Sequence, residues 1–167
     1  MTSRRRARIW AVQQLFQRDF NPDGAERVWE ALTEEHDKDE APPAGDGRTQ
    51  AFADSLVNGV IERRVEIDKL LALAAVNWKI HRMSVVDRNI MRVAICEMLL
   101  HADIPSAVTI NEAIEVAKML SDDESPRFIN GVLDRVRHDL EKQAQATPAS
   151  SDQSGKPDLS DASGVPT

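Results

Sequence analysis

Four arginines fall within five positions at the start of the chain: Arg4, Arg5, Arg6 and Arg8. Guanidinium groups this close repel one another, and the N-terminal turn of a helix is the unfavourable end of the helix dipole for a cation. The arrangement therefore indicates an anionic partner, and arginine suits both the phosphates and the unpaired bases of RNA. A solvated, frayed basic start is the alternative interpretation, and the cluster by itself leaves both open.

A second candidate site lies late in the chain, where Arg127 and Phe128 place a cation beside an aromatic ring. The preceding Ser125-Pro126 pair is typical of a helix N-terminus, with serine as the cap and proline in the first turn. The Phe128 ring suits either of two roles, stacking on a base or packing in the core. The acidic run 121–124 before this helix could hold a cation, but a solvated turn that favours the helix N-terminus is the preferred interpretation.

Catalytic and metal-binding patterns are weak. Cys96 is the one cysteine and lies among apolar residues, which favours a buried core thiol over a nucleophile. A single cysteine excludes an internal disulfide and fits a reducing compartment. The histidines have no metal-ligand spacing, and the glycines at 45–47 lie in an acidic linker rather than a phosphate-binding loop. We expect no enzymatic activity, no cofactor and no metal.

Composition sets further limits. The 167 residues carry a formal net charge of −7 and a pI of about 5.1, which excludes a uniformly basic nucleic-acid binder. The sequence contains no apolar run of the roughly 18 residues that a membrane helix needs. The N-terminus lacks the apolar segment of a secretory signal. The expected location is the cytoplasm.

Helical periodicity accounts for most of the chain. The spacing of apolar residues predicts helices over about 3–20, 25–35, 48–76, 84–101 and 125–142, and a further helix, with its apolar stripe at 110–120, after a turn at 103–105. The helix at 84–101 is apolar on nearly every side, which is typical of a central helix. Residues 144–167 contain few large apolar side chains and should form a disordered tail after a domain spanning 1–143. The predicted fold class is all-α, with six or seven helices.

An internal repeat suggests two similar halves. The segment Leu56–Arg64, LVNGVIERR, resembles Phe128–Val136, FINGVLDRV. Each copy places a glycine, Gly59 or Gly131, inside a predicted helix, where glycine costs about 1 kcal/mol relative to alanine. We expect close helix–helix approach at both glycines and two three-helix halves packed together.

Taken together, the arginine-rich start, the segment IPSAVTINEAIEVAK at 104–118 and FINGVLD at 128–134 resemble the NusB family of transcription antitermination factors. The resemblance covers about residues 4–137 and includes VDRNIMRVAICEML at 86–99. It implies two packed three-helix bundles and no enzymatic activity. It also implies binding to boxA RNA of ribosomal RNA leader transcripts, together with NusE, a small-subunit ribosomal protein, within the RNA polymerase antitermination complex.

The resemblance also implies roles for particular residues. The residues expected to contact RNA are Arg4, Arg5, Arg6, Arg8, Lys118, Glu124, Arg127 and Phe128. Those expected to face NusE are Phe16, Asp87 and Arg92. We further expect the segment 121–128 to share one RNA-facing surface with the N-terminal arginines.

Two departures and two alternatives accompany this resemblance. Cys96 stands where the family commonly has an aromatic, and Phe16 lacks the hydroxyl of a tyrosine common at that position. The same helical domain occurs at the front of a ribosomal RNA cytosine methyltransferase, which would need a further catalytic domain. A protein-interaction module without an RNA role is the other alternative. The sequence leaves open whether the chain is a monomer or a homodimer.

Overall fold

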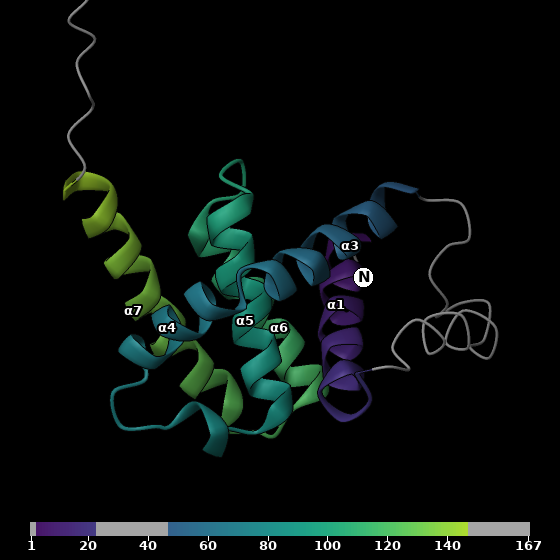
Figure 1. The fold of residues 1–167 in the computed structure, drawn as a ribbon, viewed down its shortest axis with the longest axis horizontal. Coiled ribbons are helices and arrows are strands. Elements are labelled where there is room, and N and C mark those ends of the chain that lie inside the picture. The colour runs from purple at the N-terminus through teal and green to yellow at the C-terminus, as the bar shows by residue number, and fades with distance from the viewer. Residues whose placement is uncertain (1–2, 23–46, 147–167) are drawn as a thin grey trace, which may run out of the picture.

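The computed structural model describes residues 3–22 and 47–146, and these residues form six α-helices, one short 3-10 helix and no strand (Figure 1). The helices are α1 (Ser3–Phe20), α3 (Gly47–Glu62), α4 (Arg64–Ala74), η1 (Ile80–Arg82), α5 (Val85–Leu100), α6 (Ser106–Leu120) and α7 (Ser125–Ala146). This confirms the all-α prediction. The helix expected at 25–35 and most of the predicted tail lie outside the described residues, but 144–146 belong to α7.

Helix α5 is the centre of the fold, as its all-round apolar sequence predicts. It contacts each of the other five α-helices. Its side chains are buried without a break from Asn89 to Glu97, and Met91 and Ile95 are completely inaccessible to solvent. The helices α1, α3 and α4 precede α5 in the chain, and α6 and α7 complete the second half around it (Figure 1).

The predicted helix caps are right at one site and displaced at another. Ser84 caps α5, and its hydroxyl accepts a hydrogen bond from the Asp87 amide at 3.0 Å. At α7 the cap is Asp122 rather than Ser125. The Asp122 carboxylate accepts from the amides of Glu124 at 3.1 Å and Ser125 at 2.9 Å. The acidic turn therefore stabilises the start of α7 by bonding to the amide of its first residue, Ser125, and to the amide just before it.

The single long helix expected over 48–76 is divided at Arg63. The backbone there has φ −105° and ψ 21°, so α4 leaves α3 in a new direction. Helix α3 packs against α1 and α5, whereas α4 packs against α5 and α7. One straight helix carries one apolar stripe, so the prediction of a continuous helix was wrong because two different neighbours must be reached.

The two repeat glycines have different surroundings. A Cβ atom built on Gly59 would lie 2.6 Å from the Cys96 sulfur and 2.6 Å from Leu100 Cδ1, so α3 needs glycine to approach α5. A Cβ on Gly131 would meet nothing within 4 Å, and this residue is exposed. The expected close approach is confirmed at Gly59 and wrong at Gly131.

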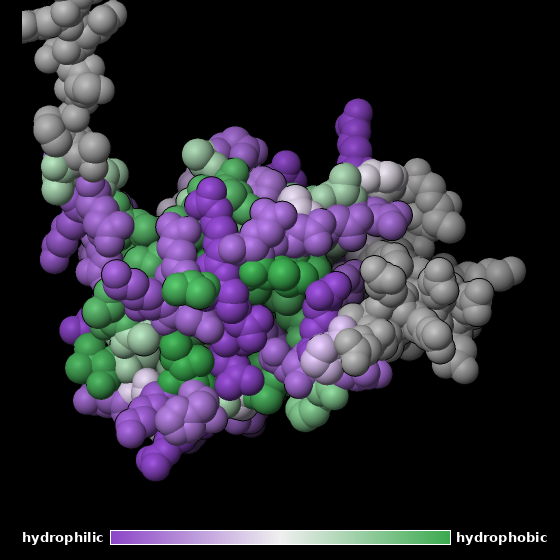
Figure 2. Space-filling view, viewed as in Figure 1, coloured by the Kyte–Doolittle hydropathy of each residue, from purple (hydrophilic) through white to green (hydrophobic). Residues whose placement is uncertain are grey.

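Large apolar side chains remain at the surface of α4 and the segment after it. Val65 is 85% exposed, Val76 is 65% exposed and Trp78 is 57% exposed. Figure 2 shows hydrophobic residues lying between hydrophilic ones on one face of the molecule. None of the described helices is long and apolar enough to cross a membrane.

The glycine pair gives a stability prediction. Gly59→Ala should lower the free energy of unfolding by about 1–3 kcal/mol, because the added methyl group overpacks the contact with α5. Gly131→Ala should raise it by roughly 1 kcal/mol, because alanine favours the helix and meets no neighbour. Urea unfolding followed by circular dichroism measures both changes. Equal effects of the two substitutions would contradict the packing described for Gly59.

Candidate nucleic-acid interface

A groove of about 970 Å³ opens between the segment 74–84 and the first turns of α7. Two aromatic rings meet in it: the centroids of Trp78 and Phe128 lie 5.5 Å apart, with the ring planes at 62°. Phe128 is half-buried and supports Trp78, which stays more than half exposed. An exposed aromatic face held by a second ring can stack on a planar ligand such as a nucleobase.

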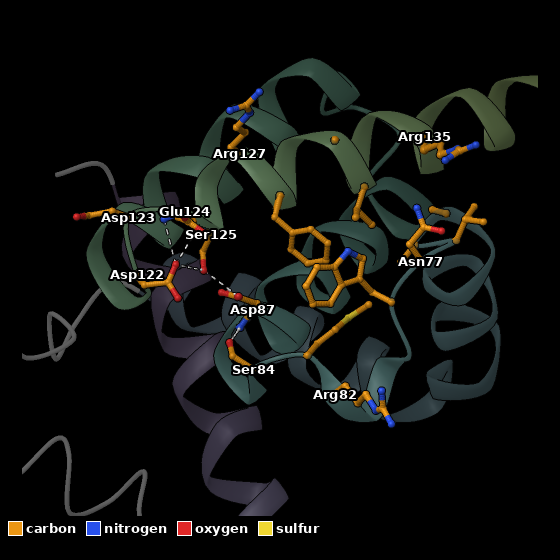
Figure 3. Close-up of a pocket in the computed structure, with 18 residues that line it drawn as sticks. Asn77, Arg82, Ser84, Asp87, Asp122, Asp123, Glu124, Ser125, Arg127 and Arg135 are labelled. Carbon is orange, nitrogen blue, oxygen red and sulfur yellow. Dashed lines mark hydrogen bonds between the residues drawn. The ribbon is translucent and has the colours of Figure 1, made fainter.

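Three arginines surround these rings. Arg127 and Arg135 project from α7, and Arg82 lies across the groove on the segment before α5 (Figure 3). All three side chains are exposed. Asp123 and Glu124 form an acidic rim at the start of α7. The groove therefore offers stacking surface, cations for phosphate, and carboxylates that can accept hydrogen bonds or repel misplaced phosphates.

The wall of the groove is held by a network of serines and aspartates. Asp87 at the start of α5 accepts hydrogen bonds from the hydroxyls of Ser121 and of Ser125, the latter at 2.8 Å. The Ser125 hydroxyl also lies 2.8 Å from the Asp122 carboxylate, so its one proton is shared between the two carboxylates. Hydrogen bonds from the hydroxyl and the amide of Ser125 hold the pKa of the Asp122 carboxyl below its usual range. The turn between α6 and α7 is thereby fixed to α5.

The N-terminal arginines have different environments. The Arg5 guanidinium forms two hydrogen bonds to the Glu112 carboxylate, at 2.8 and 2.9 Å. Arg8 forms two bonds of 2.8 Å to Glu97, and Glu97 is fully buried. Arg4 is exposed, with its guanidinium carbon 5.2 Å from the centroid of the Phe52 ring.

The expectation that Arg8 contacts RNA has to be corrected, because its side chain is buried. It is only 6% exposed, and its anionic partner is a carboxylate of the same chain. The sequence analysis indicated an anionic partner such as RNA for the arginine cluster, whereas at Arg5 and Arg8 glutamates of the same chain supply the anions. Arg4 and Arg6 remain accessible, and Arg5 is partly exposed.

The N-terminal arginines and the segment 121–128 do not form one compact patch. Arg5 meets α6 at Glu112, near the middle of that helix, whereas the turn begins at Ser121, just after its C-terminal end. A chain of charges runs between them, from Arg5 to Glu115 at 4.0 Å and from Glu115 to Lys118 at 2.7 Å. Any ligand that contacts both regions must follow the C-terminal half of α6.

The three residues expected to face a protein partner also differ in their accessibility to a ligand. Phe16 is half-buried and lines a shallow hollow of about 200 Å³ with Val86 and Leu120. Arg92 is 3% exposed, and its guanidinium bonds to Asp68 of α4 at 2.7 and 2.9 Å. Only Phe16 is placed for direct contact, since Arg92 and the buried Asp87 bind other residues of the chain.

Sequence reasoning missed three groove residues: Trp78, Arg82 and Arg135. The signal available in the sequence was the position of Trp78 between two predicted helices. A large apolar side chain outside every helical stripe has no place in the predicted core and is therefore a candidate for a binding surface. The described residues include no group of three or more histidine, cysteine or acidic side chains that could hold a metal ion. Burial raises the pKa of the Cys96 thiol to about 11, which makes it a poor nucleophile.

The two helical halves enclose an open groove lined by aromatic, basic and acidic residues, and together they define an all-helical protein with one solvent-accessible candidate binding site between its halves. Among solved structures, NusB of T. maritima is similar, with 37% identity and a TM-score of 0.68 over 86% of this chain and 99% of that one. A structure of the antitermination factors NusB and NusE in complex with dsRNA shares the fold, with a TM-score of 0.69 at 22% identity.

The NusB family model matches residues 5–138, and the chain belongs to the NusB family. The transcription antitermination protein NusB of Geobacter sulfurreducens is 46% identical over 84% of this chain and 97% of its own length. The protein of the same name from Bacillus pumilus is 42% identical over 84% of this chain and 98% of its own length.

The buried Arg8–Glu97 pair gives a prediction about stability. Arg8→Ala should lower the free energy of unfolding by about 3–5 kcal/mol, because it leaves a buried carboxylate without its partner. Arg4→Ala, at an exposed neighbour, should cost less than about 1 kcal/mol. Chemical unfolding of the two variants measures the difference. The double change Arg8→Met with Glu97→Met should recover part of the loss, and no recovery would argue against the pair as the cause.

The Arg5–Glu112 pair predicts a pH dependence. Hydrogen bonding to Arg5 lowers the pKa of Glu112 below its usual value, so the pair stabilises the fold above the unfolded pKa of about 4.3. That contribution is lost as the pH falls through the lower folded pKa. Arg5→Gln should therefore destabilise the protein modestly at pH 7, while the difference from wild type should shrink in acid. A difference that stays constant with pH would contradict this linkage.

Proposed function

We propose that this chain is a transcription antitermination factor that binds single-stranded boxA-type RNA together with NusE. The observation that carries the proposal is the groove, where Trp78 and Phe128 meet between three exposed arginines. Stacking of a base on an aromatic side chain contributes about 1–3 kcal/mol, and a few phosphate contacts add to it. The names of the relatives support the role in antitermination.

The proposed RNA surface consists of the groove and the accessible basic residues along α1 and α6. In the groove, Trp78 and Phe128 provide stacking, and Arg82, Arg127 and Arg135 bind phosphates. Glu124 stands at the rim, where its carboxylate selects for bases that can donate a hydrogen bond. Outside the groove, Arg4, Arg5, Arg6 and Lys118 form a second contact area. Arg8 is assigned to the fold rather than to RNA.

The proposed protein-partner surface is the hollow around Phe16. Its neighbour Phe20 lies 4.8 Å away between ring centroids and is 66% exposed, so the end of α1 presents an apolar surface. A solved relative whose structure contains NusB, NusE and dsRNA supports a protein partner of this kind. Asp87 and Arg92 act indirectly, by fixing α5 to the α6–α7 turn and to α4. We place the protein in the cytoplasm and assign it no catalytic step.

A binding experiment tests the proposal. A boxA-type RNA is titrated with the chain alone, with NusE alone and with both, and the pair should bind more tightly than either protein. Combining Trp78→Ala with Arg127→Gln should weaken binding by the pair at least tenfold, because a stacked base and a phosphate contact are both lost.

The salt dependence provides a second measure. Each phosphate contact to single-stranded RNA contributes about −0.7 to the slope of log K against log salt concentration, so Arg127→Gln should make the slope shallower by roughly 0.7. The control is Arg63→Gln, an exposed arginine at the junction of α3 and α4 that is paired with Glu66 and does not line the groove. Failure of the pair to bind RNA at all, or equal losses from test and control substitutions, would refute the RNA-binding groove.

A further inference from the structure

One exposed stripe of α7 is basic over most of the length of the helix. Its members recur at intervals of four, four, three and four residues, which places them on one face. They are Arg127, Gly131, Arg135, His138 and Lys142. We call this stripe the α7 track. Every one of its members is exposed to solvent.

Among the described residues, the basic members of the α7 track differ from their neighbours in having no ion-pair partner. On the adjacent face, Arg137 lies 2.7 Å from Asp134 and 3.6 Å from Glu141, and its hydrogen bond to Asp134 raises its pKa. By contrast, Arg135 and Lys142 form no ion pair with any residue in the described part of the chain. One face of α7 is thus neutralised within the helix, whereas the other presents free cations in a protein whose net charge is −7.

The track is continuous with the groove. Arg127, Gly131 and Arg135 line the groove, and His138 and Lys142 lie farther along the same face. At 1.5 Å per residue, the distance along the axis from Arg127 to Lys142 is about 22 Å. Figure 1 shows the last turns of α7 extending away from the other helices, and Figure 2 shows mostly hydrophilic residues there.

Gly131 keeps this path open. Nothing lies within 4 Å of the position its Cβ would occupy, so packing does not require glycine there. The residue instead leaves bare backbone between Arg127 and Arg135, where a ribose or base can approach the helix closely. Packing among the described residues therefore gives no reason for a glycine at a position where it lowers helix stability.

We propose that RNA leaving the groove continues along the α7 track, so that the bound segment is longer than the groove itself. Arg127, Arg135 and Lys142, which have no ion-pair partner among the described residues, match a chain of phosphates, since each phosphate carries one charge at regular intervals. Gly131 provides the close approach, and Lys142 marks the far end of the contact. This inference rests on the proposed RNA binding and extends its footprint toward the C-terminal end of α7.

The test uses the full chain with NusE and two RNAs. One is a minimal boxA-type RNA, and the other is the same RNA lengthened with unpaired uridines at both ends. Wild type should bind the longer RNA about fivefold more tightly at moderate salt. The double variant His138→Gln with Lys142→Gln should lose that advantage, make the salt slope for the longer RNA shallower by about 0.7, and leave binding of the minimal RNA unchanged.

Matched controls separate the possible outcomes. Arg137→Gln removes a positive charge from the paired face and should preserve the length advantage. Gly131→Leu should weaken binding of both RNAs while thermal unfolding shows an intact fold. Equal affinity of wild type for the two RNAs would overturn the inference, as would an equal loss for both RNAs in the double variant.

A further arm separates RNA from another anionic surface. Vesicles containing phosphatidylserine are offered to wild type and to the double variant. Binding to vesicles that the double variant loses, with both RNAs unaffected, would assign the track to lipid and overturn the inference. Absence of any RNA binding by wild type with NusE would instead refute the proposed function itself, so the two failures are distinguishable.

Discussion

The buried ion pair between Arg8 and Glu97 joins α1 to the central helix. Thr109 of α6 donates a hydrogen bond of 2.7 Å to the same carboxylate, so three helices meet at one fully buried group. A buried charge is tolerated only when its bonding capacity is satisfied, and the geometry of the three donors therefore fixes the relative register of the helices. Because Arg8 is fixed along α1, the positions of Arg4 at one end and Phe16 at the other follow from it.

The groove depends on contacts between the two halves of the fold. One wall comes from the segment after α4, which precedes α5 in the chain, and the other comes from the start of α7. Asp87 connects these walls through its serine partners, and the α4–α7 and α4–α5 contacts set the separation of the walls. The stacking surface consequently forms only when both halves are packed, and substitutions at a distance from the groove, for example at Asp68 or Arg92, should act on its shape rather than on its chemistry.

The sequence predicted the parts of the fold that local patterns encode. The apolar stripes placed α1, α5 and α6, and the all-round apolar character of 85–100 identified the central helix. The division at Arg63 was not predictable because it arises from packing against different neighbours. The partner of Arg8 lies 89 residues away, and no spacing rule reveals so distant an ion pair. The groove was predicted only at Arg127, Phe128 and Glu124, since Trp78 reaches it through tertiary contacts. The roles of these residues in RNA binding stay predictions.

The hollow and the groove share a thin partition. At the start of α5, Val86 lines the hollow and its neighbour Asp87 lines the groove. At the end of α6, Leu120 lines the hollow, and Asp122, two residues later, lines the groove. Two ligands seated on either side of a wall only one or two residues wide can touch each other above it. Direct contact between ligands makes their binding cooperative without any movement of the protein. For a protein partner at Phe16 and an RNA at Trp78, this chain would then add to its own contacts with each ligand by holding the two ligands side by side.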